Sequence, residues 1–356
     1  MSQNMNVKSF VYMWSKRILA SAIICIVITG LAYYGTKTWI TQWAQTPIES
    51  FAEQDITIKA GDSTHRIIRL LKQDSDLIKT WHFKVLFIFH PELAQLKVGH
   101  YHLTEKPTPI ELFGILGSGI EKQYSVTFIE GSTFSQWLEI LDQHPNINYS
   151  QVRVDNYISS FKPSSVDETT YTYARVEGQF FPDTYNFNNN TQAIEILTRA
   201  HKMLTTKLDY HWERRDNSVP LDNKHEALVL ASIIEKETGI ASEREDIASA
   251  FVNRLNKKMR LQTDPTVIYG AADDYAGDIT YRHLRHKNSY NTYKINGLPP
   301  TPIAMPSEGA IKAAVNPAST PYIYFVASGD GGHVFSTTLR EHNLATQRYL
   351  KKIKQK

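Results

Sequence analysis

An uncharged run near the N-terminus constrains this chain more than any other feature of its sequence. The run extends from Ile18 to Tyr34 and reads ILASAIICIVITGLAYY. A helix needs about 20 apolar residues to cross a hydrocarbon core of roughly 30 Å, and continuation of the helix to residue 40 supplies the missing length. We therefore predict a single membrane-spanning helix over residues 18–40.

The charges that flank this run predict its orientation. Lys8, Lys16 and Arg17 precede it, whereas Lys37 is followed by acidic residues at positions 49, 53 and 55. Because positively charged flanks stay in the cytoplasm, residues 1–17 are predicted to be cytoplasmic. The chain is therefore predicted to cross the membrane once, with everything from about Thr36 onward outside the cytoplasm.

Three alternatives to an anchor fit the run less well. A cleaved signal peptide would have a shorter apolar region and a small-residue cleavage site. A lipoprotein signal would place a lipobox before Cys25, but the preceding residues are Ala22-Ile23-Ile24. A buried core helix would show a polar face. Since Cys25 is the only cysteine, we expect no disulfide and no thiol chemistry in the exported part.

The rest of the composition is that of an ordinary globular protein. The chain has 356 residues, of which 42% are hydrophobic and 21% charged, enough for one large or two medium domains. The net charge of +3 is small and the lysines and arginines are scattered, so we expect no nucleic-acid partner. The basic residues 351–356 are predicted to form a solvated tail.

Residues 55–121 predict a small α+β unit after a polar linker over residues 41–54. Ile56 and Ile58 alternate as in a strand, the next few residues offer a turn and a helix N-cap, and residues 98–103 indicate a second strand. This order resembles a LysM-like module, with Ala60-Gly61-Asp62-Ser63 at the Gly-Asp-Ser/Thr turn of that family. A small spacer domain without glycan contact remains the alternative.

Residues 122–350 predict a larger, helix-rich α+β domain, and one of its helices carries a candidate catalytic acid. Between residues 222 and 238, Leu230, Ile233 and Ile234 recur on one helical stripe, and Glu237 falls on the same stripe. Glu235 points about 140° away at 100° per residue. Only one of the two neighbouring carboxylates is therefore expected to face the apolar side.

Two effects are expected to raise the pKa of Glu237. Gly239 is expected to end the helix, which puts Glu237 in the last turn, where the helix dipole disfavours negative charge. Desolvation by the apolar stripe acts in the same direction. A carboxyl group that keeps its proton near neutral pH suits a general acid. Glu226 lies near the stripe but in the first turns, where the dipole favours its ionised form. From this helix alone, a structural carboxylate bonded to a neighbouring backbone or Arg is the alternative.

The segments around this helix resemble a known family. Residues 242–245 read as a capping box that opens another helix. The chain looks like a member of the endolytic murein transglycosylase family, also called YceG-like or MltG, over about residues 126–350. The strings that carry the resemblance are residues 231–238 (ASIIEKET), 261–270 (LQTDPTVIYG), 290–293 (YNTY) and 297–303 (GLPPTPI), extended by 321–326 (PYIYFV), 331–333 (GGH) and 341–343 (EHN).

This resemblance implies an activity and a set of partners. The family cleaves the β-1,4 bond between N-acetylmuramic acid and N-acetylglucosamine inside peptidoglycan strands and leaves 1,6-anhydromuramyl ends. Its catalytic acid falls on Glu237. The implied partners are peptidoglycan glycan strands, the inner membrane through residues 18–40, and the peptidoglycan synthases whose nascent strands the enzyme would shorten. Neither a metal nor a cofactor is expected. Candidates for sugar contacts, with loop packing as their alternative, are Gln262, Tyr290, Asn291 and Tyr293.

Rival functions rest on weaker signals. His283-x-x-His286 lacks a nearby third metal ligand, and neither H-E-x-x-H nor G-x-S-x-G occurs. A hydrolytic muramidase would need a second carboxylate about 5–9.5 Å from the first, and Glu177, Asp183 and Asp264 are candidates. A non-enzymatic peptidoglycan-binding scaffold would keep the LysM-like module beside a decayed cleft.

Overall fold

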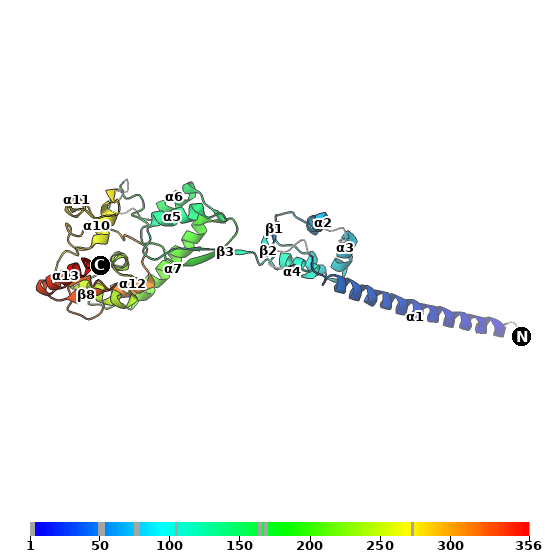
Figure 1. Ribbon diagram of the computed structural model, residues 1–356. Coiled ribbons are helices and arrows are strands. Elements are labelled where there is room, and N and C mark those ends of the chain that lie inside the picture. Colours follow the sequence, from blue (N-terminus) through cyan, green and yellow to red (C-terminus); the bar gives the residue numbers. More distant parts are fainter. Residues whose placement is uncertain are drawn as a thin grey trace. The chain divides into compact units, whose positions relative to one another are not determined.

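The structure is a computed structural model that describes residues 4–48, 54–74, 79–103, 106–162, 166, 170–271 and 274–355. The chain divides into two compact units, Met1–Gln123 and Tyr124–Lys356 (Figure 1). Both mix helices with short strands, as the α+β prediction requires. Within the described part of the chain the strands form four two-stranded sheets.

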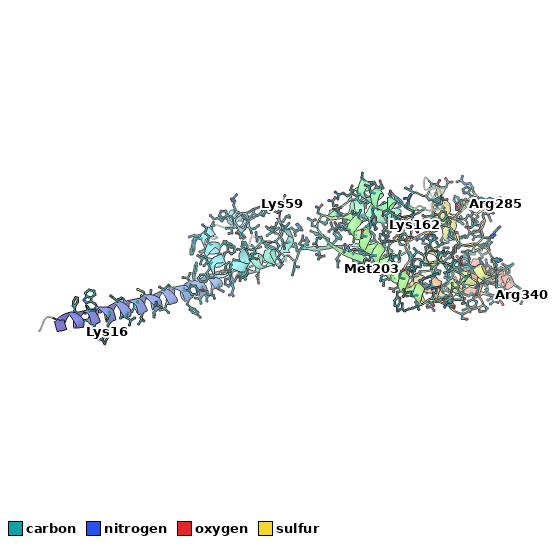
Figure 2. All side chains as sticks on the ribbon, turned by 180° about the vertical axis from the view of Figure 1, so that it is seen from behind. Lys16, Lys59, Lys162, Met203, Arg285 and Arg340 are labelled. Atoms are coloured by element: carbon teal, nitrogen blue, oxygen red, sulfur yellow. The ribbon has the colours of Figure 1, made fainter. Side chains whose placement is uncertain are left out.

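The first unit begins with a long apolar helix, α1 (Asn4–Trp43). Its stretch Phe10–Trp43 is long and apolar enough to cross a membrane. Residues 10–39 are exposed, and their side chains project from the helix (Figure 2). The predicted apolar helix is therefore present, and it extends beyond residues 18–40 at both ends.

A strand, a helical segment and a second strand follow α1. The strands β1 (Gln54–Ile58) and β2 (Gly99–Leu103) pair antiparallel. The alternation of β1 buries Ile56 and Ile58 in the core of the unit. Between the strands lie α2 (Thr64–Asp74), α3 (Thr80–Phe89) and the 3-10 helix η2 (Pro91–Ala94), and α4 (Pro109–Ser118) follows β2.

Part of the predicted polar linker belongs to this core. Ile40, Ala44 and Ile48 are buried together in the first unit. The backbone N–H of Ile48 donates to the carbonyl of Pro107 at 2.9 Å. Residues 41–43 continue α1, and Ala44 and Ile48 lie beyond its end but are buried in the same core, so residues 41–48 of the predicted linker belong to the folded unit. Residues 49–53 of the expected linker lie outside the described residues.

The second unit contains two hydrophobic cores. One forms around α5 and the first half of α7, and the other around α8, α9 and α12. The elements up to α8 are β3 (Gln123–Thr127), α5 (Phe134–Gln143), β4 (Ile147–Asn148), α6 (Gln151–Ser159), β5 (Thr184–Asn188), β6 (Thr191–Gln192), α7 (Ala193–Glu213) and α8 (Lys224–Glu237). After it come η3 (Ala241–Glu243), α9 (Arg244–Asn256), α10 (Asp264–Ala271), α11 (Tyr281–Arg285), α12 (Glu308–Val315), β7 (Tyr324–Ala327), β8 (His333–Ser336) and α13 (Leu339–Ile353).

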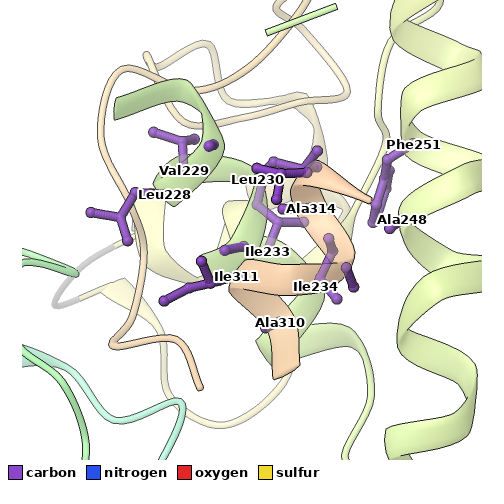
Figure 3. Packing of buried hydrophobic residues seen from close by; sticks show 14 of the residues in the cluster. Leu228, Val229, Leu230, Ile233, Ile234, Ala248, Phe251, Ala310, Ile311 and Ala314 are labelled. Carbon is purple, nitrogen blue, oxygen red and sulfur yellow. The ribbon is translucent and has the colours of Figure 1, made fainter. Parts of the chain in front are cut away.

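Helix α8 is the centre of the second core. Its N-cap Asn223 accepts a hydrogen bond from the backbone N–H of Glu226, and every residue from Ala227 to Ile234 is buried. Side chains of α8, α9 and α12 meet in this core (Figure 3). The single apolar stripe predicted for α8 was too narrow, because its run ALVLASII is apolar all round and such a helix is buried on every side.

The C-terminal elements form a small layer. β7 and β8 pair antiparallel, and α13 packs on both strands. The predicted basic tail is partly helical, because α13 continues to Ile353 and Lys352 pairs with Asp330.

Candidate active site

A cleft of about 520 Å³ opens beside the C-terminal end of α8. Five segments that are separate in the sequence form its wall. These are the end of α8, α9 through Arg254, the loop before α10, the loop around Tyr293, and the β7–β8 layer with the start of α13. The lining residues are Glu237, Arg254, Leu261, Gln262, Thr263, Asp264, Tyr293, Tyr324, Phe325, Val326, Ala327, His333, Leu339, His342 and Asn343.

Glu237 is the last helical residue of α8 and lies in this wall. Burial raises the pKa of its carboxyl group above the usual range. A hydrogen bond from the Thr263 hydroxyl to Oε1 lowers the pKa, the charge of Asp264 raises it, and the positive charges of His333 and Arg254 lower it. The net shift is upward, in the direction expected from the sequence.

The loop before α10 holds Thr263 under Glu237. Gln262 has a φ of 52°, a left-handed conformation that costs a non-glycine residue about 1 kcal/mol or more. Thr292 stabilises this turn, because its carbonyl accepts from Gln262 N at 3.3 Å and its Oγ1 accepts from Thr263 N at 3.0 Å. The turn leaves Gln262 exposed while Thr263 is buried.

Tyr293 forms another part of the wall. Its hydroxyl donates to Asp264 Oδ1 at 2.7 Å. Burial raises the pKa of Tyr293, and the hydrogen bond to Asp264 adds to the shift, so the phenol stays protonated. The structure thus brings Glu237, Gln262 and Tyr293 to one cleft.

Tyr290 and Asn291, which the sequence analysis also named, are fully buried. The hydroxyl of Tyr290 lies 2.6 Å from Thr301 Oγ1. Asn291 Nδ2 donates to the carbonyl of His286 at 2.7 Å, and its Oδ1 accepts from Tyr293 N at 3.0 Å. The prediction of direct sugar contacts was therefore wrong for these two residues. They pack the loop that carries Tyr293, which was the alternative.

Several cleft residues carried no assigned role in the sequence. Arg254 ties two walls together, because its Nε donates to the carbonyl of Ile323 and its Nη1 to that of Leu261, both at 2.6 Å. The ring of His342 stacks on Tyr324 with centroids 5.2 Å apart. These residues come from separate segments, so no local spacing marks them, although His342 lies in the EHN string of the family resemblance.

The capping box predicted for residues 242–245 does not open α9, and Glu243, which lies within these residues, has a different role. It occupies the N-cap position of α9 without a side-chain capping bond. Its carboxylate instead accepts from His333 N at 2.9 Å and lies 2.7 Å from His333 Nδ1. Burial opposes ionisation of Glu243, but these bonds lower its pKa overall. This tertiary contact fixes His333 at the cleft.

Glu235 faces away from the cleft, as its helical phase predicts, but it is not exposed. Only 6% of its side chain is accessible, and its carboxylate accepts from Ser307 N at 3.0 Å and lies 3.6 Å from Arg244 Nη2. Glu235 therefore joins α8 to the N-terminus of α12.

Residues 56–348 match the model of the YceG-like family. The chain belongs to the YceG-like family. It is 32% identical to an endolytic murein transglycosylase of Bacillus subtilis (strain 168), over 91% of each chain. An endolytic murein transglycosylase of Streptococcus pneumoniae is 25% identical over 91% of this chain, which spans 63% of that relative. The crystal structure of a YceG-like protein from Listeria monocytogenes matches with a TM-score of 0.50 and 29% identity, over 82% of this chain and 99% of that one.

In this YceG-like protein, one of the three acids considered as a second carboxylate reaches the cleft. Asp264 lines it, whereas Glu177 and Asp183 are not among the lining residues. Glu177 is 3% exposed and accepts from Phe134 N at 3.0 Å and from the Tyr269 hydroxyl at 3.3 Å. Burial raises the pKa of Glu177 to about 8, so it is a neutral core residue near pH 7.

In the YceG-like fold, His283 of the His283-x-x-His286 pair has a local structural contact. His283 Nδ1 accepts from Thr280 N at 3.2 Å in the capping box of α11. His333 and His342 line the cleft. Within the described ranges, no three His, Cys, Asp or Glu side chains form a group that could hold a metal ion.

Proposed function

We propose that this protein is an endolytic peptidoglycan lytic transglycosylase. It is a lyase that cleaves the bond between N-acetylmuramic acid and N-acetylglucosamine within glycan strands and leaves 1,6-anhydromuramyl ends. The observation that carries this proposal is Glu237, a carboxyl group with a raised pKa in the wall of the cleft. Relatives over nearly the whole chain are endolytic murein transglycosylases, which supports the same reaction.

In the first step Glu237 acts as a general acid. The hydroxyl of Thr263 holds Oε1, so Oε2 is the oxygen that presents a proton to the cleft. That proton passes to the glycosidic oxygen as its bond to muramyl C1 breaks, and the leaving sugar keeps a hydroxyl group. The oxocarbenium-like charge that develops on the muramyl ring lies in a cleft that also contains the carboxylate of Asp264.

In the second step the same residue acts as a base. The carboxylate of Glu237 takes the proton of the muramyl C6 hydroxyl, and the C6 oxygen attacks C1 to close the 1,6-anhydro ring. Glu237 is then protonated again, so one carboxyl group completes the cycle without water. The positive charge of Arg254 favours the carboxylate form between the two steps.

Sugar binding is assigned to the exposed parts of the cleft wall. Gln262 is exposed beside the acid and offers an amide for hydrogen bonds. Tyr293 presents a ring and a hydroxyl group on the same cleft. An aromatic face next to hydrogen-bonding groups suits a sugar, which has an apolar ring face and a polar edge.

We infer from the predicted layout of the chain that this reaction takes place outside the cytoplasm. Residues 18–40 form a single-pass anchor in the cell inner membrane, with residues 1–17 cytoplasmic and the catalytic domain, residues 122–350, in the periplasm. Residues 55–121 form a LysM-like module, which the antiparallel β1–β2 pair with helices between its strands supports. Peptidoglycan synthases in the same membrane would supply the nascent strands.

One observation favours a second reaction. Asp264 lies in the cleft with Glu237, and a carboxylate in this place can activate water for hydrolysis. A hydrolytic muramidase would leave reducing ends instead of anhydro ends.

The test is to digest purified sacculi with the full chain in detergent and to weigh the released products. Glu237→Gln is compared with Glu226→Gln, which makes the same chemical change at the opposite end of α8. Anhydro ends, lighter by one water than reducing ends, together with loss of activity in Glu237→Gln alone, are expected. Reducing ends would favour the muramidase. Binding without cleavage would favour a scaffold, and unchanged cleavage by Glu237→Gln would refute the assigned acid.

A further inference from the structure

Helix α3 packs along the end of α1 in the first unit, where the apolar helix meets the folded part (Figure 1). The rings of Trp39 and Trp81 stack with centroids 5.5 Å apart and planes 10° apart. The rings of Tyr33 and Phe89 lie 5.1 Å apart. Trp81, at the start of α3, contacts residue 39 of α1, whereas Phe89, at the end of α3, contacts residue 33. The two helices therefore run antiparallel. α3 therefore points back along the apolar helix.

The positions of the charged residues in α1 indicate how deep in the bilayer this contact would lie. After Arg17 the next charged residue is Lys37, and the 20 residues that end at Lys37 span about 30 Å at 1.5 Å per residue. This length equals the hydrocarbon thickness of a bilayer. Tyr33 lies four residues, or about 6 Å, inside Lys37. The C-terminal end of α3, at Phe89, lies at the level of Tyr33 and therefore at the outer edge of the hydrocarbon.

The outward face of α3 carries two large apolar side chains and one lysine. Trp81 stays 48% exposed although it stacks on Trp39, Ile88 is 73% exposed, and their spacing of seven residues puts them on one side of the helix. Lys84 also lies on this side and is exposed. A lysine on such a face can extend its ammonium group to lipid phosphates while its methylene chain stays in the apolar layer. Large exposed apolar groups at this density mark an interaction surface.

The adjacent part of α1 has the composition of a membrane boundary. Tyr33, Tyr34 and Trp39 are exposed around the last turns. Tyrosine and tryptophan concentrate at the level of lipid headgroups, where an apolar ring and a polar group are both satisfied. The exposed aromatic groups of α1 and the outward face of α3 thus form one continuous boundary layer.

We propose that α3 is an interfacial membrane helix, which embeds its Trp81–Ile88 face in the leaflet from which α1 emerges. This inference rests on the proposed membrane anchor. The occupant is lipid rather than protein, because the face continues the lipid-facing surface of α1 and carries Lys84 at headgroup level. The ring of His90, 3.3 Å from Glu92, follows directly and limits the depth to the headgroup boundary. The first unit would then be held against the bilayer at two places instead of swinging from a single helix.

Depth measurements on the full chain test this proposal. In a Cys25→Ser background, a single cysteine replaces Ile26, Tyr34, Ile88 or Tyr281, all of which are exposed, and receives a nitroxide label. The protein is reconstituted in vesicles of phosphatidylcholine and phosphatidylglycerol, and its fold is checked by circular dichroism. Electron paramagnetic resonance then compares access of oxygen, which enters lipid, with access of a nickel chelate, which stays in water.

The label at Ile88 is expected to favour oxygen over nickel and to match the depth of Tyr34, while the label at Tyr281 favours nickel. If the nickel chelate reaches the label at Ile88 as readily as the label at Tyr281, the interfacial helix is refuted. The anchor still stands in that case if the label at Ile26 stays protected. Nickel access at Ile26 would overturn the anchor itself. Low access of both reagents at Ile88 would mean that protein covers this face, and dilution with unlabelled chain would show whether a second copy does so.

Discussion

Replacing Glu177 by glutamine tests whether this buried acid is a neutral structural group. In the protonated state Glu177 sits between Phe134 N and the Tyr269 hydroxyl. A glutamine side chain keeps both partners, because its carbonyl accepts from Phe134 and its amide donates to the Tyr269 oxygen, which reverses the bond that the Tyr269 hydroxyl donates to Glu177. The variant therefore removes the titration without removing the hydrogen bonds.

The size of the effect follows from the pKa of Glu177. Burial raises it from 4.5 to about 8. Between these values the folded protein holds a proton that the unfolded chain releases, so stability falls as pH rises through this window and is highest below it. At about 1.4 kcal/mol per pKa unit, the loss approaches about 5 kcal/mol by pH 8, as an upper limit. Glu177→Gln should not show this loss.

Unfolding of the second unit, followed in detergent from pH 5 to 9, measures this difference. The wild-type protein should lose stability more steeply than Glu177→Gln, and the variant should be the more stable of the two at pH 9. Glu308→Gln is a control of opposite sign. Hydrogen bonds from Lys207 lower the pKa of Glu308 despite the opposing effect of burial, and bonds from His211 add to this, so its removal should cost a little stability above about pH 5.

Glu177→Gln also distinguishes a structural role of Glu177 in the core from a catalytic role. Glu177→Gln should cleave sacculi at a rate near that of the wild type, because Glu177 does not line the cleft. If the free energies of unfolding of the variant and the wild type changed with pH in parallel, the raised pKa of Glu177 would be refuted. Loss of cleavage in a variant that unfolds normally would refute the structural role and would reopen the two-carboxylate mechanism.

Three further predictions concern α8 and the cleft. Thr263→Val removes the hydroxyl that favours ionised Glu237. The alkaline limb of the kcat/KM profile should therefore shift by about 1 pH unit to higher pH, and kcat/KM should fall about tenfold. Thr266→Val, which removes a nearby buried hydroxyl that does not contact Glu237, should cost stability without this shift, and equal shifts in both would contradict the assignment. Asp264→Asn removes a negative charge that raises the pKa of Glu237, so the alkaline limb of the pH profile should move to lower pH while anhydro products persist. Glu235→Ala should lower the free energy of unfolding by about 3 kcal/mol, measured by denaturant titration, because it leaves buried donors without their acceptor.

Local pattern predicted much of this protein. The apolar run of α1 and the strands β1 and β2 follow from composition and from a period of two or 3.6 residues, which neighbouring residues alone encode. The place of Glu237 at the end of α8, and the separation of Glu235 from the cleft, follow from the same helical phase. The family resemblance supplied the reaction that these residues are proposed to perform.

Tertiary structure decided which residues meet. Tyr290 and Tyr293 stand three positions apart in one string, yet one is in the core and the other lines the cleft. Thr263 and Arg254 reach the surroundings of Glu237 from other segments, and no spacing in the sequence marks them. Periodicity predicts which side of its own helix a residue faces. What lies on that side depends on long-range packing, and so does the pKa of Glu237.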